Sequence, residues 1–238
     1  GFHPEAAVLV TTLRGLRWHG GIKADSLGAG NIDAVLAGLP NLGKHIENIR
    51  RFGVPAIVSI NRFADDSPEE LDAVLGYARE RGAGAAIAEP YTVGGAGCEA
   101  LARELLDLID KSPSRYAPIY EFQMPATEKI ETIAREIYGA DGVDFDPAAR
   151  TDIRRAEASG GRDLPICMAK THLSLSDNPR LLARPSGFRI SVRRVLYHAG
   201  AGYLVALAGD INTMPGLPKV PAAVHIGVDA HGHTVGLS

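Results

Sequence analysis

The sequence predicts an α/β fold, in which a parallel sheet carries helices and is followed by a smaller α+β domain. Two observations lead to this prediction. Between residues 6 and 110, apolar strands alternate with amphipathic helices, whereas the remainder begins with helices and ends in alternating strands and turns. Continuous apolar strands that alternate with helices are typical of a parallel sheet with both faces covered.

Three strands and three helices are expected in the first part of the chain. The strands are the apolar runs 6–13, 55–60 and 85–90. The helices show apolar residues three and four positions apart, and they cover 41–53, 67–82 and 97–110. The second helix has a clear start, because Ser67 is a capping residue and Pro68 suits the first turn. Since a strand begins so early, either the chain is a fragment or its sheet is completed elsewhere.

The segment 112–118, SPSRYAP, interrupts this alternation and predicts a boundary between two domains, 1–111 and 112–238. The second domain is expected to contain two helices, one strand and two hairpins. The helices are predicted at 127–139 and 146–161 and the strand at 164–170. The hairpins are predicted at 188–209, around an AGAG turn, and at 224–238.

Composition limits the possible functions. The chain has 238 residues and a net charge of −3, so no overall positive field attracts nucleic acid. It has no run of 18 apolar residues, so a membrane span is not expected. Its two cysteines, Cys98 and Cys167, fall in apolar stretches far apart, which predicts inert core residues in a reducing, cytoplasmic setting.

Several chemical motifs are missing from the sequence. No G-x-x-x-x-G-K-[ST] phosphate loop, no G-x-S-x-G and no H-E-x-x-H is present. Three histidines, His225, His231 and His233, lie close together near a turn, but no carboxylate cluster accompanies them. We therefore expect no metal site.

Two aromatic residues follow neighbouring predicted strands. Phe63 follows strand 55–60 and Tyr91 follows strand 85–90. Ligands of parallel α/β sheets bind outside the carboxyl ends of the strands, and two aromatic faces there can hold a flat heterocycle. The alternative is ordinary packing of two loop residues against the end of the sheet.

Other polar positions are candidates for loops of a site. Asn61 ends a strand, where it either reads a base or caps a turn. His19, Gly20 and Gly21 form either a polar loop at a ligand or a surface turn. Lys170 begins a polar segment after strand 164–170, which is either part of a site or a solvated loop.

Long stretches of the sequence resemble the formate–tetrahydrofolate ligase family. The resemblance is carried in order by NLGKHIENIRRFGVPAIVSINRF, EIYGADGV, LPICMAKT, LSLSDNP and TMPGLPKVPAA, with VGLS at the end. It covers all of this chain but only the C-terminal part of the family's usual length. It implies a fold like that of P-loop nucleoside triphosphatases, with the phosphate loop in the part that is absent here.

The resemblance also implies site residues. In the family, aromatic residues at the positions of Phe63 and Tyr91 sandwich the pterin ring of tetrahydrofolate, and Ile87 matches a position in the apolar wall. The family commonly has Trp where this chain has Tyr91. His172-Leu173 and Asn212 are further departures from the family pattern.

The implied reaction joins formate to tetrahydrofolate with ATP, giving 10-formyltetrahydrofolate, ADP and phosphate. The implied cofactors are ATP, Mg²⁺ and a monovalent cation, and the implied partners are tetrahydrofolate, formate and the missing N-terminal part, in a homo-oligomer. One alternative is a folate-binding or regulatory module without catalysis. Another is a fragment of a different nucleotide-dependent ligase that uses Asn61 and Arg62 for a base.

Overall fold

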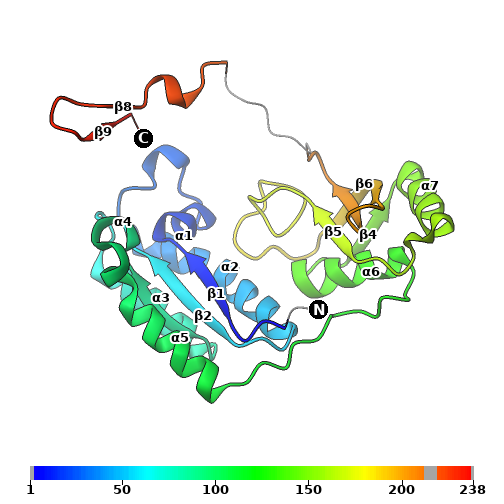
Figure 1. Cartoon of the computed structure of the whole chain (residues 1–238), viewed down its shortest axis with the longest axis horizontal. Helices are drawn as coiled ribbons and strands as arrows, with labels where there is room; N and C mark the ends of the chain where they lie inside the picture. Colours follow the sequence, from blue (N-terminus) through cyan, green and yellow to red (C-terminus); the bar gives the residue numbers. More distant parts are fainter. Residues whose placement is uncertain (1–2, 212–218, 237–238) are drawn as a thin grey trace.

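The computed structural model describes residues 3–211 and 219–236, and Figure 1 shows two main sheets on opposite sides of the molecule. Each sheet has its own hydrophobic cluster: the first cluster includes Val58 and Ile60, and the second includes Ile190 and Leu204. In the described part of the chain, no helix has the length and apolar character that crossing a bilayer requires.

The first sheet contains the three predicted strands, all parallel, in the order β1-β2-β3. These strands are β1 (Ala7–Thr11), β2 (Ala56–Asn61) and β3 (Gly84–Ala88). The helices around them are α1 (Leu13–His19), α2 (Ile32–Arg51), α3 (Pro68–Glu80), α4 (Pro90–Val93) and α5 (Glu99–Lys111), with short 3₁₀ turns at Ala24–Ser26 and Gly94–Cys98. Ser67 caps α3 in a capping box with Glu70, as its sequence predicts. The predicted parallel sheet with helices is confirmed.

Two helical features of this part are absent from the sequence prediction. Helix α1 was not predicted, and α2 begins at Ile32 rather than residue 41 and contains Pro40 in its interior. The two helices touch closely because glycines lie at their crossing. A Cβ on Gly20 would fall 2.0 Å from the Ala34 carbonyl oxygen, and one on Gly38 would fall 2.1 Å from that of Leu16.

Strand β1 lies at an open edge, and the prediction that both its faces are buried is wrong. Val8 is 42% exposed and Val10 is 63% exposed, whereas Leu9 between them packs against the first cluster. Side chains alternate along a strand, so Val8 and Val10 share the other face. Helix α5 packs against β3 and β2 and leaves that face of β1 open.

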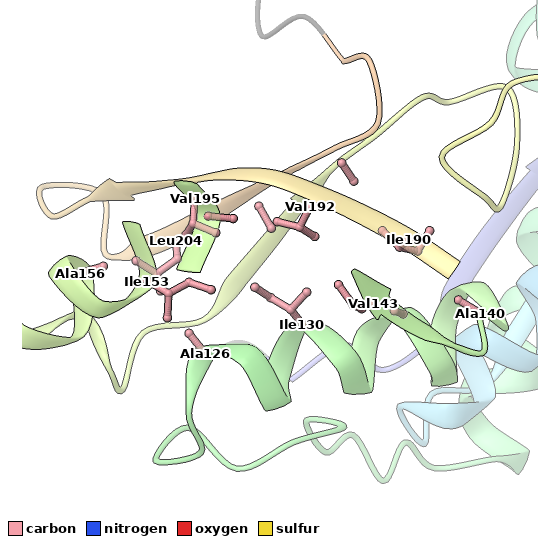
Figure 2. Close-up of a cluster of buried hydrophobic side chains, with 14 of the residues drawn as sticks. Ala126, Ile130, Ala140, Val143, Ile153, Ala156, Ile190, Val192, Val195 and Leu204 are labelled. Atoms are coloured by element: carbon pink, nitrogen blue, oxygen red, sulfur yellow. The ribbon is translucent and has the colours of Figure 1, made fainter. Parts of the chain in front are cut away.

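The second sheet has the order β4-β6-β7-β5. Its strands are β4 (Gly142–Phe145), β5 (Ile166–Ala169), β6 (Arg189–His198) and β7 (Tyr203–Ala208). The predicted β6–β7 hairpin and strand β5 are confirmed, but β4 was not predicted. Helices α6 (Ala126–Ile133) and α7 (Pro147–Ala156) each continue into a π-helical turn, at Ala134–Tyr138 and Glu157–Gly161. Figure 2 shows their apolar side chains packed against the sheet.

The predicted burial of the two cysteines is wrong. Cys167 is exposed because β5 is an edge strand of its sheet. Cys98 is half-buried in the turn that precedes α5, outside the apolar stripe of that helix. No residue of α5 is fully buried, and Leu106 is 63% exposed.

Polar contacts along α2 join the half of the molecule that contains the first sheet to the half that contains the second sheet. Arg184 binds Glu47 with two hydrogen bonds of 2.7 and 2.8 Å. The Lys44 ammonium donates to the Glu136 carbonyl oxygen over 2.6 Å, and Arg51 pairs with the Glu136 carboxylate over 2.7 Å. The boundary at 112–118 lies in an irregular segment between α5 and α6, and the division into two domains stays a prediction.

The predicted terminal hairpin is present as two short strands, β8 (Gly227–Val228) and β9 (Thr234–Val235), after a 3₁₀ turn at Ala222–Val224. Most of the family motif TMPGLPKVPAA falls at 212–218, together with Asn212, and these positions lie outside the described residues.

Candidate functional site

The ends of β2 and β3 bring Phe63 and Tyr91 to the same edge of the first sheet. Asn61, the last residue of β2, is in register with Ala88, the last residue of β3. The Arg62 backbone N–H donates to the Ala88 carbonyl oxygen over 3.0 Å. An ion pair of 3.5 Å between Arg62 and Glu89 further links the two chain segments. Asn61 is half-buried at this edge.

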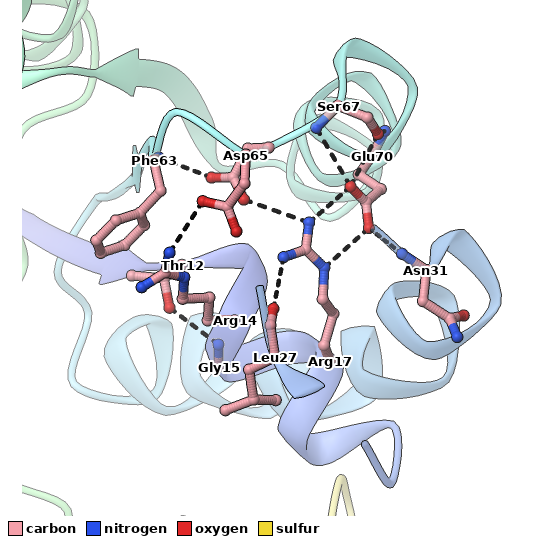
Figure 3. A network of polar contacts seen from close by, with 11 residues as sticks. Thr12, Arg14, Gly15, Arg17, Leu27, Asn31, Phe63, Asp65, Ser67 and Glu70 are labelled. Atoms are coloured by element: carbon pink, nitrogen blue, oxygen red, sulfur yellow. Dashed lines mark hydrogen bonds and ion pairs between the residues drawn. The ribbon is translucent and has the colours of Figure 1, made fainter. Parts of the chain in front are cut away.

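Phe63 sits in a turn whose shape is fixed by hydrogen bonds (Figure 3). Its backbone N–H donates to the Asp66 carboxylate over 2.8 Å, and its carbonyl oxygen accepts from the Asp66 N–H over 3.1 Å. The Arg14 guanidinium lies 4.2 Å from the centre of the Phe63 ring. Arg14 is itself held by Asp65, over 2.9 Å. One face of the half-buried ring is therefore covered by a cation.

A buried ionic network lies directly behind this turn (Figure 3). Arg17 donates to both carboxylate oxygens of Glu70, over 3.0 and 2.7 Å, and to Asp66 over 3.3 Å. Arg17 is 0% exposed, Glu70 1% and Asp66 5%. Arg17 also donates a 2.8 Å hydrogen bond to the Leu27 carbonyl oxygen. Arg17 thus connects α1, the following loop and the start of α3 to the turn that carries Phe63.

Glu70 is the centre of this network. Besides Arg17, it accepts hydrogen bonds from the Asn31 backbone N–H and the Ser67 hydroxyl, each over 2.8 Å. Burial alone would raise the pKa of the Glu70 carboxyl, but the hydrogen bonds from Arg17, Asn31 and Ser67 prevail and lower it to about 2. Glu70 is therefore a carboxylate at every physiological pH.

The other two residues of the predicted clamp have different settings. Tyr91 lies in the short helix α4 and is 96% exposed. Ile87 lies on β3 in register with Ile60 and is half-buried against the first cluster. The structure thus brings Phe63, Tyr91 and Ile87 to one edge of the first sheet.

The remaining candidates lie at a second location. His19 ends α1, Gly20 caps that helix, and Gly21 has a φ of 94° that favours glycine. Gly20 packs against α2, which gives it a structural role. His19 and Lys170 both line a cavity of about 260 Å³ between the two halves of the molecule. Another residue of this cavity, His45 on α2, is not predicted from the sequence, because nothing in the helical pattern of 41–53 distinguishes it from its neighbours.

For metal binding, the described residues contain no group of three His, Cys, Asp or Glu side chains placed to hold an ion. In the terminal hairpin, the His231 and His233 backbone N–H groups both donate to the Asp229 carboxylate, over 2.8 and 2.9 Å. Asp229 therefore closes this turn.

Comparisons with known proteins support the sequence resemblance. The family model described as "Formate--tetrahydrofolate ligase" matches residues 1–238. The "Formate--tetrahydrofolate ligase" of Paracoccus denitrificans (strain Pd 1222) is 48% identical over 237 residues, which covers 100% of this chain. The chain spans 42% of the length of that relative.

Proposed function

Because this chain belongs to the formate–tetrahydrofolate ligase family, we propose that it is the C-terminal portion of an enzyme that makes 10-formyltetrahydrofolate. The substrates would be tetrahydrofolate, formate and ATP. The role of this portion is to hold the pterin ring at the carboxyl edge of its first sheet. The observation behind this assignment is the position of Phe63. Asp66 fixes the turn that carries this residue, and the Arg14 guanidinium covers one face of its ring.

The geometry suits one half of an aromatic sandwich. Arg14 covers one face of the Phe63 ring, so a ligand would stack on the opposite face. A cation on the far face of a ring is attracted to its π-electrons and holds the ring in place. Tyr91, from α4, would supply the second aromatic wall, and Ile87 the apolar floor. Tyr91 is almost fully exposed here, and a stacked pterin would cover it.

The phosphate chemistry belongs to another part of the enzyme. The sequence contains no G-x-x-x-x-G-K-[ST] motif, so ATP, Mg²⁺ and the monovalent cation would be held mainly by residues outside this chain. Among the described residues, β1 is the last strand on its side of the sheet, and its face with Val8 and Val10 is exposed; a sheet that continues in the missing part, with further elements covering this face, would fit both features. This chain would position the acceptor amine of the folate, which reduces the entropy lost in reaching the transition state.

The test is folate binding by the complete ligase that carries this chain. Stacking contributes about 0.5–1.5 kcal/mol per aromatic pair, and the buried ring adds transfer energy. Since 1.4 kcal/mol is a factor of ten, Phe63→Ala should weaken tetrahydrofolate binding by about tenfold or more, with ATP affinity unchanged. Tyr91→Trp should preserve or strengthen binding, because it restores the family's larger ring.

Phe122→Ala is a matched control, since Phe122 is a partly exposed phenylalanine in the irregular segment before α6. It should leave both affinities unchanged. Equal losses of folate and ATP binding in Phe63→Ala, or no loss at all, would exclude the clamp. The non-catalytic alternative makes a different prediction. This chain would bind folate, but no formylation would be detected when it is combined with the N-terminal part, ATP, formate and tetrahydrofolate.

A further inference from the structure

The cavity between the two halves of the molecule has an unusual chemical lining. It lies where the end of α1, the middle of α2 and the segment after β5 meet, and its volume is about 260 Å³. Among the described residues that line it, three are histidines, one is a lysine and none is an acid. These residues are His19, Asn41, His45, Tyr138, Met168, Lys170, Thr171, His172, Ser174 and Leu175.

Lys170 is held in place but is not neutralised by a carboxylate. Its ammonium donates to the carbonyl oxygens of Thr171, over 2.8 Å, and of Ser174. It also lies 4.9 Å from the centre of the Tyr138 ring. An ammonium has three N–H donors, so one is free for another acceptor. Within the described residues, Lys170 forms no ion pair of 4.0 Å or less, and Asp177, its electrostatic neighbour, accepts from the Ser191 N–H instead.

The imidazoles of the cavity supply further donors. His19 Nδ1 accepts a hydrogen bond from the Ala183 backbone N–H over 3.2 Å, so in the neutral ring the proton is on Nε2. Asn41 donates to the carbonyl oxygen of the same Ala183, over 3.0 Å. Ala183 has a φ of 53°, a conformation that a residue with a side chain adopts rarely. Two specific bonds thus fix this wall around His19.

Burial and nearby positive charges disfavour the charged forms of these groups. Burial lowers the pKa of His19, and His45 lowers it further. Burial also lowers the pKa of His45, with Lys170 and Lys44 adding to the effect. For Lys170, burial lowers the ammonium pKa to about 8. A negative ligand would reverse each of these shifts, because it favours the charged form of every cation around it.

We propose that this cavity binds a small oxyanion, of the carboxylate or phosphate type, through Lys170, His19 and His45. This site is distinct from the proposed folate clamp, with which it shares no residue. It lies on the side of α2 that faces the second half of the molecule. One water takes roughly 30 Å³ in the liquid, so the cavity has room for a phosphate or a small carboxylate with a few waters, but not for a nucleotide. A bound anion would join α2 to the segment after β5 and stabilise the contact between the two halves.

The test uses the complete ligase that carries this chain, with inorganic phosphate and acetate as probes. The readout is the titration of the His19 and His45 imidazoles by NMR, which localises binding even if phosphate also enters the ATP site. Saturation with the bound anion should raise both pKa values by about one unit, since an opposite charge within a few ångströms has this effect. A response to phosphate alone or to acetate alone identifies the class of ligand, and either supports the site.

Lys170→Met and His45→Gln should each weaken the anion's effect about tenfold, which corresponds to the loss of one charge-assisted hydrogen bond. Two variants are used so that one can replace the other if it fails to fold, which circular dichroism will show. The controls are Lys111→Met on α5 and His198→Gln on β6, both at exposed positions, which should behave as wild type. Unchanged imidazole titrations with both anions, or wild-type binding in Lys170→Met, would overturn the proposal. Neither result would bear on folate binding at Phe63.

Discussion

Replacing Glu70 by Gln tests the buried network that supports the Phe63 turn. The pKa of Glu70 falls from 4.5 to about 2 on folding, and each unit corresponds to 1.36 kcal/mol, so its ionised form contributes about 3 kcal/mol to stability. Removing one partner of a buried ion pair typically costs about 3–5 kcal/mol, because the other charge stays buried. Glu70→Gln should therefore lower the free energy of unfolding by about 3 kcal/mol.

Urea denaturation followed by tryptophan fluorescence measures this effect. The sequence has one tryptophan, Trp18, which neighbours Arg17 on α1 and so reports on this half of the molecule. Glu69→Gln is the matched control, since Glu69 is in the same first turn of α3 but is exposed. It should change stability by less than about 0.5 kcal/mol. In a double-mutant cycle, Arg17→Met with Glu70→Gln should cost clearly less than the sum of the two single changes.

The pH dependence has a definite sign. The folded pKa of Glu70 is lower than its unfolded pKa, so its contribution is complete above about 4.5 and is lost as pH falls toward about 2. Wild type should lose stability across this window more steeply than Glu70→Gln does. If Glu70→Gln were no more destabilising than Glu69→Gln, or if the two single changes were additive, Arg17 and Glu70 would not form the coupled pair described here.

Two further predictions concern packing and exposure. Gly38→Ala should destabilise strongly, because its Cβ would meet the Leu16 carbonyl oxygen where α1 and α2 cross, whereas Gly76→Ala in α3, with open space around it, should stabilise by about 0.5–1 kcal/mol; equal unfolding midpoints for the two variants would contradict this. Alkylation of the native protein should modify the exposed Cys167 faster than the half-buried Cys98, and mass spectrometry of digested peptides will show which is labelled first.

Local sequence signals were sufficient to predict those helices and strands that have clear capping or turn residues at their ends. Ser67 followed by Pro68 marks the start of α3, and the AGAG turn marks the β6–β7 hairpin. Local signals fail where contacts across the fold decide. Pro40 normally ends a helix, yet α2 continues through it and packs closely against α1 around the nearby Gly38. Strand β4 has only four residues, too few for a periodic pattern, and is stabilised by pairing with β6.

The candidate site shows the same division. The positions of Phe63 and Tyr91 after neighbouring strands could be predicted, because register places both strand ends at one edge. The roles of Arg14 and Arg17 could not, since their partners Asp65 and Glu70 lie about fifty positions away in sequence. In the sequence, isolated arginines such as these look like residues of a solvent-exposed helix face. Only the fold shows that Arg17 is completely buried.

The buried network is better explained by positioning than by stability. Apolar residues of similar volume are often as stable as a buried ion pair, so burial of Arg17 and Glu70 is not in itself the most stable arrangement. What apolar residues could not do is orient Asp66. One oxygen of Asp66 receives Arg17, and the other receives the Phe63 backbone N–H. The direction of the Phe63 ring thus depends on a chain of hydrogen bonds that begins at α1, so a loss of Arg17 should disturb a ligand at Phe63 even though Arg17 lies buried behind the turn.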